Sequence, residues 1–218
     1  MTDWVMDEAA TAGIPWARLF GRGDETTRER SARLPAVTRP AAPLETADFP
    51  RRLETAHLLL EVPKVEDLPF VERMASDPSM FRFSERGPMS PEEAWSLLLR
   101  TIGHWSAVGY GVFAVREKES GRFAGLVGGS TFHRGFGPDF DDLPELTWSI
   151  ASEFRGRGYA TEAGAAVIEA FEAQPAARST VCLIHVDNQK SLRVASKLSF
   201  RFFSHSTYRG YGAGLFRR

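Results

Sequence analysis

The sequence predicts a mixed α/β (α+β) fold, because two kinds of apolar pattern alternate along most of its 218 residues. Short runs rich in Val, Leu, Ile and Phe indicate strands, and longer segments with apolar residues at every third or fourth position indicate helices. Glycines and prolines separate these segments at turn positions. Strands that alternate with helices in this way are typical of a sheet covered by helices.

The first predicted elements are a strand and two helices. Residues 57–62 form an apolar, strand-like run, and residues 65–74 carry apolar side chains at helical spacing. A second helix is expected over residues 90–107, because Ser90 can cap its start and a glutamate, Glu93, stands at the third helical position.

The remaining elements complete a sheet of about seven strands. Residues 136–142 are expected to form a loop. The other predicted elements are strands at 110–115, 122–127, 145–151 and 180–186, helices at 159–173 and 188–198, and an aromatic-rich hairpin that ends near Phe216.

Composition excludes several classes of protein. The 27 basic and 28 acidic residues leave a formal net charge of −1, whereas a nucleic-acid binder carries an excess of basic residues. No apolar run approaches the roughly 18 residues of a membrane span. The five histidines show no metal-ligand spacing, and Cys182 is the single cysteine, so neither a metal site nor an intramolecular disulfide is expected. A cytoplasmic protein without nucleic-acid or membrane partners fits these features.

The chain divides into two parts of different character. Residues 1–50 contain glycines and prolines that interrupt any long periodic element, and we predict a partly irregular N-terminal extension there. Acids precede the first basic residue, Arg18, so this segment is not expected to be a signal peptide. Residues 51–218 are predicted to form one domain.

The segment that carries chemistry lies between the strand at 145–151 and the helix at 159–173. Gly156 and Gly158 allow backbone N–H groups to converge on one point, and the free N–H groups of a helix start attract phosphate. Arg155 and Arg157 can add charge-assisted hydrogen bonds. The alternative is a glycine turn that only connects strand to helix.

Three motifs resemble the GNAT superfamily of acetyl-CoA-dependent N-acetyltransferases. Arg155-Gly-Arg-Gly-Tyr-Ala160 matches the Q/R-x-x-G-x-G/A pyrophosphate loop of that family. The continuation Tyr159-Ala-Thr-Glu-Ala163 and the stretch Asn188-Gln-Lys-Ser191 to Lys197-Leu-Ser-Phe200 are similar to the ribosomal-protein alanine/serine (RimJ/RimL-like) branch, and so is Leu53 to Glu61. The resemblance covers about residues 53–216 and implies a GNAT fold, with a mostly antiparallel sheet splayed between its fourth and fifth strands.

The resemblance also implies acetyl-CoA as the acetyl donor, with no metal. It assigns the pantetheine arm to Trp148, Ser149, Ile150, Ala151 and Ser152, the diphosphate to Arg155, Gly156, Arg157, Gly158, Tyr159 and Ala160, and contacts beside the arm to Asn188 and Ser191. The plainer alternatives are that Asn188 caps the following helix and that Ser191 is a solvated helix residue.

Catalytic roles follow from the same resemblance. Glu145, at the start of the fourth strand, is the candidate base, and the alternative is a glutamate that merely begins a strand. Many GNAT members use as general acid a tyrosine seven residues after the asparagine that corresponds to Asn188, and this chain has Ala195 at that position. Ser191 is therefore the candidate acid, with Tyr208 and Tyr211 as alternatives without a known position.

The predicted function is an acyltransferase that moves an acetyl group directly to a primary amine. The acceptor stays open between a protein N-terminus and a small-molecule amine, and a homodimer is compatible with the resemblance. A non-catalytic acyl-CoA-binding or interaction module of the same fold is the alternative. A nicotinamide-dependent oxidoreductase is excluded, because only 31 residues follow Asp187, too few for the further β-α units of that fold.

Overall fold

The computed structural model describes residues 49–83, 87–174 and 179–218. The predicted extension at 1–50 lies outside this part of the chain except for its last two residues. One of these, Phe49, is buried, and its ring lies 4.7 Å from that of Phe171 and 6.0 Å from that of Trp105. None of the described helices is long and apolar enough to cross a membrane.

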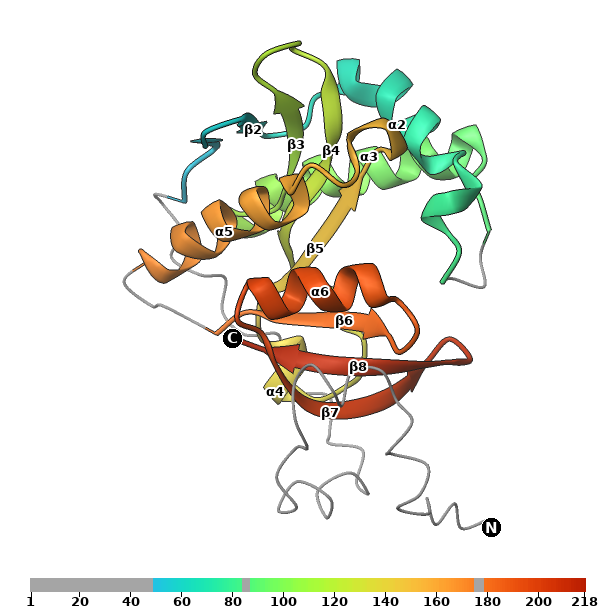
Figure 1. The fold of residues 1–218 in the computed structure, drawn as a ribbon, viewed down its shortest axis with the longest axis vertical. Helices are drawn as coiled ribbons and strands as arrows, with labels where there is room; N and C mark the ends of the chain where they lie inside the picture. The colour runs from blue at the N-terminus through green and yellow to red at the C-terminus, as the bar shows by residue number, and fades with distance from the viewer. Residues whose placement is uncertain (1–48, 84–86, 175–178) are drawn as a thin grey trace.

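Eight strands and the helices around them make up the domain (Figure 1). The strands are β1 (Arg52–Glu54), β2 (Leu58–Glu61), β3 (Val112–Glu117), β4 (Phe123–Ser130), β5 (Glu145–Ile150), β6 (Val181–His185), β7 (Arg201–Tyr208) and β8 (Tyr211–Arg217). The α-helices are α2 (Leu68–Ala75), α3 (Pro91–Val108), α4 (Pro138–Asp141), α5 (Tyr159–Glu172) and α6 (Gln189–Lys197). Short 3-10 helices are η3 (Val65–Asp67), η4 (Pro78–Met80) and η5 (Ser152–Phe154).

All eight strands belong to one sheet, in the order β1-β2-β3-β4-β5-β6-β8-β7. Every neighbouring pair is antiparallel except β5 and β6, which are parallel and meet at the single residue pair Glu145 and Val181. Beyond that point the two strands diverge, as Figure 1 shows. The predicted splay is therefore confirmed. The prediction of about seven strands missed β1, because its three residues are too few to give a periodic signal.

Helices cover both faces of the sheet. Helix α5 crosses one face over β4 and β5, and α2 lies on the opposite face, packed against α3 (Figure 1). The core on the α5 side includes Leu146, Val167 and Phe200, and the core on the α2 side includes Val71, Leu98 and Leu126. Side chains of a strand alternate between its two faces. Leu146 of β5 therefore points to the α5 side of the sheet, and its neighbours Glu145 and Thr147 point to the α2 side.

The predicted helix boundaries are confirmed where capping residues set them. The Ser90 hydroxyl accepts a hydrogen bond from the Glu93 N–H (3.2 Å), and the Glu93 carboxylate accepts one from the Ser90 N–H (2.9 Å). Gly109 ends α3 in the left-handed conformation with φ of 85°.

The expected loop at 136–142 instead contains the single helical turn α4. Asp141 holds this turn, because its carboxylate accepts from the N–H groups of Gly137 (2.8 Å) and Arg134 (2.6 Å). A helix of four residues has too little periodicity to be predicted from the sequence.

Gly128 allows β3 and β4 to approach each other closely. A Cβ atom at Gly128 would lie 2.4 Å from both the Gly111 carbonyl oxygen and the Val112 Cα. Gly128→Ala is therefore expected to lower the free energy of unfolding by about 3 kcal/mol, because neither backbone atom can move away. Urea denaturation measures the loss. The matched control is Gly103→Ala in the exposed middle of α3, where a Cβ meets no atom within 4 Å. That change is expected to stabilise the protein by about 1 kcal/mol, and a similar loss in both variants would contradict the explanation.

Candidate active site

The loop before α5 is built to hold an anion. Gly156 and Gly158 adopt φ values of 81° and 85°, which glycine favours, and a Cβ at either position would point into open space. Within the described part of the chain, the N–H groups of residues 156–160 donate to no backbone acceptor. They surround the N-terminus of a 14-residue helix, whose dipole favours negative charge. This arrangement can bind phosphate groups through the backbone alone.

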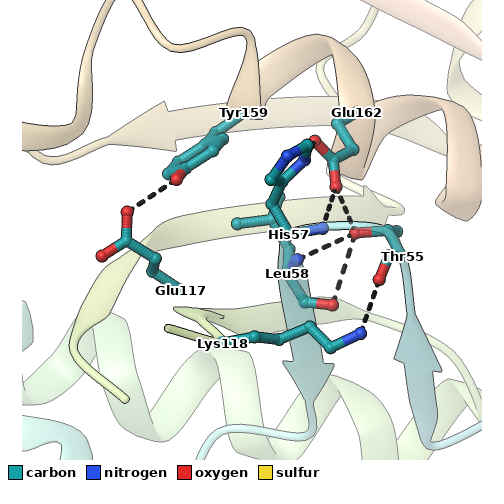
Figure 2. Close-up of polar contacts among 7 residues, drawn as sticks. All are labelled: Thr55, His57, Leu58, Glu117, Lys118, Tyr159 and Glu162. Carbon is teal, nitrogen blue, oxygen red and sulfur yellow. Dashed lines mark hydrogen bonds and ion pairs between the residues drawn. The ribbon is translucent and has the colours of Figure 1, made fainter. Parts of the chain in front are cut away.

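Side chains of the loop fasten it to the end of β3. The Tyr159 hydroxyl donates to one Glu117 oxygen at 2.6 Å (Figure 2). The Arg157 Nη1 donates to the same oxygen at 2.7 Å, and the Ser120 hydroxyl donates to the other oxygen. The hydrogen bonds from Ser120 and Tyr159 lower the pKa of Glu117 against the opposing effect of burial. The Arg157 guanidinium is thus engaged by the protein, and the loop backbone is held in place.

A second anchor joins α5 to the turn between β1 and β2 (Figure 2). One oxygen of Glu162 accepts from the Thr55 hydroxyl (2.5 Å) and the His57 N–H (2.8 Å), and the other lies 3.0 Å from the His57 Nδ1. Burial raises the pKa of Glu162, but the hydrogen bonds from Thr55 and His57 lower it by more than burial raises it. The net shift of the pKa is therefore downward. The carboxylate in the first turn of α5 therefore has its own partners, and the helix start stays available to an anion.

The Arg155 side chain is bound by the end of β5 and by the η4 segment. Its Nε donates to the Ile150 carbonyl (3.0 Å), its Nη1 donates to the Ser79 hydroxyl (2.7 Å), and its Nη2 contacts the Met80 sulfur. Asp77 lies 3.7 Å from the same guanidinium. Arg155 thus ties the end of β5 to the η4 segment, and the two arginines of the motif both have protein partners in this structure.

The edge of β5 that faces β6 is open after its first residues. The Ala151 N–H donates to the Ala124 carbonyl, at the start of β4 (2.9 Å). Because successive residues of a strand direct their backbone groups to opposite edges, those of Trp148 and Ile150 point toward the gap between β5 and β6. The Ile150 carbonyl already accepts a hydrogen bond from the Arg155 Nε. An extended ligand in the gap can hydrogen-bond to the Trp148 N–H and C=O and to the Ile150 N–H.

Helix α6 forms the other side of this gap. The Asn188 Oδ1 accepts from the Ser191 N–H (3.1 Å) and so caps α6, as the plainer alternative expected, while its amide nitrogen remains a possible donor. The Trp148 Nε1 donates to the Ser191 hydroxyl (3.2 Å) across the gap. Ser191 is therefore not simply solvated, and its hydroxyl keeps its own hydrogen for donation.

Glu145 lies where β5 and β6 meet, almost completely buried at 4% exposure. Its two oxygens accept from Nε (2.5 Å) and Nη2 (2.8 Å) of Arg134, and the Arg134 Nη1 donates to the Tyr208 hydroxyl (2.6 Å). The guanidinium lies between the rings of Phe132 and Tyr208, 4.4 and 4.7 Å from their centres. Burial raises the pKa of Glu145, and the hydrogen bonds and charge of Arg134 offset only part of that rise.

A cavity of about 270 Å³ lies between α3 and the sheet, beside the open end of β5. Thr147 and Ser149 line it from β5, and Met74, Met80 and Met89 line it from the α2 side. Its wall also contains His104, whose side chain is fixed by two hydrogen bonds.

The two ring nitrogens of His104 have different roles. The Nδ1 donates to the Tyr110 carbonyl (2.7 Å), and the Nε2 accepts from the Thr131 N–H (3.0 Å). Burial lowers the pKa of His104, although the bond to Tyr110 opposes the shift. The imidazole is therefore neutral near pH 7 and belongs to the wall of the cavity. No group of three or more His, Cys, Asp or Glu side chains suited to a metal occurs among the described residues.

The structure brings the predicted residues to one region and adds others. Trp148 and Ser191 meet directly, and residues 155–160 follow the open edge of β5. Glu117 and the cavity lining were not identified from the sequence, because these residues come from separate segments that share no motif. Tyr208, predicted without a position, lies beside Arg134.

Comparisons with known proteins agree with this geometry. A protein-family profile described as the Acetyltransferase (GNAT) domain matches residues 57–201. A protein from Bordetella pertussis, assigned to the GnaT acetyltransferase family, is 31% identical with a TM-score of 0.68, and the match covers 78% of this chain and 99% of that one.

More distant structures share the fold. An acetyltransferase from Salmonella typhimurium that modifies the N-terminal serine of ribosomal protein L7/L12 is 17% identical with a TM-score of 0.62, covering 75% and 95% of the two chains. The microcin C7 self-immunity acetyltransferase MccE, solved with acetyl-CoA and AMP, is 14% identical with a TM-score of 0.61, covering 75% and 92%.

A splayed sheet beside an anion-binding loop defines an acyl-CoA-dependent transferase. The chain belongs to the GNAT acetyltransferase family, so it is an N-acetyltransferase that uses acetyl-CoA as donor. The resemblance of the sequence to the GNAT superfamily is thereby confirmed.

Gly158→Ala is expected to weaken CoA binding at least tenfold, because the φ of 85° is strained for alanine and the amides around it would turn away from the diphosphate. Isothermal titration calorimetry with CoA measures the change. Gly121→Ala, at another left-handed position (φ 66°) with open space in the turn between β3 and β4, is the matched control. Equal affinity in the Gly158 variant and the wild type would rule out the backbone anion site.

Proposed function

We propose that this enzyme transfers the acetyl group of acetyl-CoA directly to a primary amine, carried by a protein N-terminus or a small molecule. The observation that supports this most strongly is the single residue pair between β5 and β6. It leaves an open strand edge that leads from Glu145 to the anion loop, and an extended pantetheine arm with a diphosphate at one end has matching groups in the same order. The similarity to the RimJ/RimL-like branch favours a protein N-terminus.

The proposed donor site uses the residues that the sequence indicated. The pantetheine arm pairs with the backbone around 148–152, and the diphosphate lies on the N–H groups of 156–160. The amide nitrogen of Asn188 and the hydroxyl of Ser191 face the arm from α6. We assign the arginine side chains of the motif a supporting role, because Arg155 and Arg157 hold the loop through Ser79 and Glu117.

Glu145 is the proposed base, acting through a water molecule. The acceptor amine must lose its proton before attack, and its pKa is about 8 for a protein N-terminus and about 10.4 for a lysine-like amine. Burial raises the pKa of Glu145 and so makes it a better proton acceptor, while Arg134 fixes its orientation. The competing role is purely structural, as the partner of Arg134.

Glu145→Gln is expected to lower kcat about a hundredfold or more while the KM for acetyl-CoA stays within about twofold. Because only the deprotonated carboxylate accepts a proton, kcat/KM of the wild type should fall as the pH drops through the raised pKa of Glu145, and the variant should lose this limb. Thiol release with acetyl-CoA over a range of pH gives both readouts. Glu119→Gln, in the exposed turn between β3 and β4, serves as the control. An unchanged pH profile with reduced thermal stability would assign Glu145 the structural role.

Ser191 is the proposed proton donor to the departing CoA thiolate. Ala195, at the position of the tyrosine used by many relatives, is fully buried and cannot donate a proton. The Ser191 hydroxyl accepts from Trp148 across the gap, which leaves its hydrogen directed elsewhere. Tyr208 is the alternative donor, because Arg134 donates to its oxygen and leaves its hydrogen available.

Ser191→Ala is expected to lower kcat about tenfold, because the thiolate then leaves without a proton donor. Tyr208→Phe, assayed in parallel for thiol release, is the comparison. If the tyrosine variant alone loses activity, Tyr208 is the donor and Ser191 is not. Ser191→Thr, which retains a hydroxyl, should recover part of the rate if donation rather than packing is responsible.

The second candidate function is an acyl-CoA-binding module without turnover, and the observation that favours it is Ala195 in place of an acid. Measured CoA binding with no thiol release from any amine would support this candidate over the enzyme. A cytoplasmic location is part of the main proposal, because the only cysteine, Cys182, is buried and free.

A further inference from the structure

We propose that the cavity between α3 and the sheet binds an apolar group carried next to the acceptor amine. The preferred acceptors are then primary amines with a linear or aromatic apolar tail, rather than polycationic amines or N-termini with a small polar side chain. This inference rests on the proposed acetyl transfer to an amine and names the class of acceptor for that same site.

The lining of the cavity is mostly apolar. Nine of its sixteen lining residues are apolar, and they include Met74, Met80, Phe81, Met89, Leu97 and Phe132. Methionine side chains are flexible and polarisable, so they adapt to alkyl and aromatic groups of different shape. A tail that enters this cavity gains the free energy of leaving water at each methylene group.

The charges around the cavity disfavour a polycation. Among the described residues that line it, none is Asp or Glu, and the charged one is Arg100. His104 supplies no negative charge either. Its imidazole is neutral, and both ring nitrogens already have hydrogen-bond partners in the protein. A second ammonium group would therefore be desolvated without a counter-charge, which is costly. A single amine that loses its proton at the reaction centre avoids this cost.

The cavity adjoins the proposed site of transfer through β5. Thr147 and Ser149 direct their side chains into the cavity, and alternation places Glu145 on the same face of the strand. Two residues of a strand span about 6.6 Å, so Glu145 lies one such step from the wall of the cavity. An amine near Glu145 can thus place a tail of a few carbon atoms past Thr147.

Two hydrogen bonds fasten described parts of the cavity rim. The Met89 N–H donates to the Ala75 carbonyl (2.9 Å), which fastens the segment before α3 to the end of α2. The bond from Arg155 to the Ser79 hydroxyl fastens η4 to the end of β5. The parts of the rim on either side, at η4 and before α3, are therefore held in place by the protein itself. The cavity volume of about 270 Å³ leaves room for a tail of several carbon atoms.

The decisive experiment is a homologous series of n-alkylamines from propylamine to octylamine, assayed for thiol release with acetyl-CoA. The amines share a pKa near that of lysine, about 10.4, so only the tail varies. We expect kcat/KM to rise about fourfold for each added methylene until the cavity is filled. A flat series, or better rates with spermine or kanamycin than with hexylamine, would overturn the inference.

A cavity-filling variant locates the effect. Leu97→Trp should lower kcat/KM for hexylamine at least tenfold and have a smaller effect on propylamine, while the affinity for CoA stays unchanged. The matched control is Leu99→Trp on the same helix, because Leu99 is 45% exposed and does not line the cavity. Equal losses in the two variants, or none in either, would show that the tail binds elsewhere. The wild-type series tests the inference even if Leu97→Trp fails to fold.

Two further experiments identify the kind of acceptor and test the cavity independently of turnover. The first uses peptides that are identical except for an N-terminal Met, Phe or Ser, and it tests protein N-termini beside the free amines. The inference requires kcat/KM for the Met and Phe peptides to exceed that for the Ser peptide. Calorimetric titration of hexylamine into the CoA complex tests the cavity without turnover. Binding that Leu97→Trp abolishes, without thiol release, would reject the proposed transfer and retain the cavity. Thiol release that does not depend on the tail would reject the cavity as the binding site and retain the proposed transfer.

Discussion

The structure depends on one constraint, which is that β5 and β6 are held together at a single residue pair. Val181 donates to the Pro144 carbonyl, and the strands then diverge, so hydrogen-bonding groups of Trp148 and Ile150 have no neighbouring strand. A backbone edge that is left open inside a protein must find another partner. Here the open edge of β5 leads toward the start of α5, and α6 lies on the other side of the gap, where Ser191 accepts from Trp148.

The anion loop shows how a motif can be correct while its side chains act differently from expectation. The glycines of the motif have positive φ values, and the N–H groups of residues 156–160 donate to no backbone acceptor within the described part of the chain. The arginines instead bind Glu117 and the η4 segment, so they determine where the loop lies. Local sequence specifies the conformation of such a loop, but the partner of a long side chain depends on which strand folds beside it.

The sequence predicted the elements that have capping residues or long periodic patterns. Ser90, Glu93 and Gly109 mark both ends of α3, and the apolar face of α5 extends over four turns. It did not predict β1 or α4, whose three and four residues carry no period. It named Glu145 and Tyr208 but not their connection through Arg134, because residues 134, 145 and 208 come together only through the sheet order. The cavity lining escaped prediction for the same reason.

The contact between Arg134 and Tyr208 links the site to the order in which the chain is synthesised. Glu145 and Arg134 leave the ribosome long before the final hairpin, and until then the guanidinium lacks the ring and hydroxyl that complete its surroundings. Strand β8 must also enter the sheet between β6 and β7. A nascent chain that ends before β7 therefore contains Glu145 and Arg134 without the Tyr208 ring beside them, and the surroundings of Glu145 are complete only once β7 and β8 have joined the sheet.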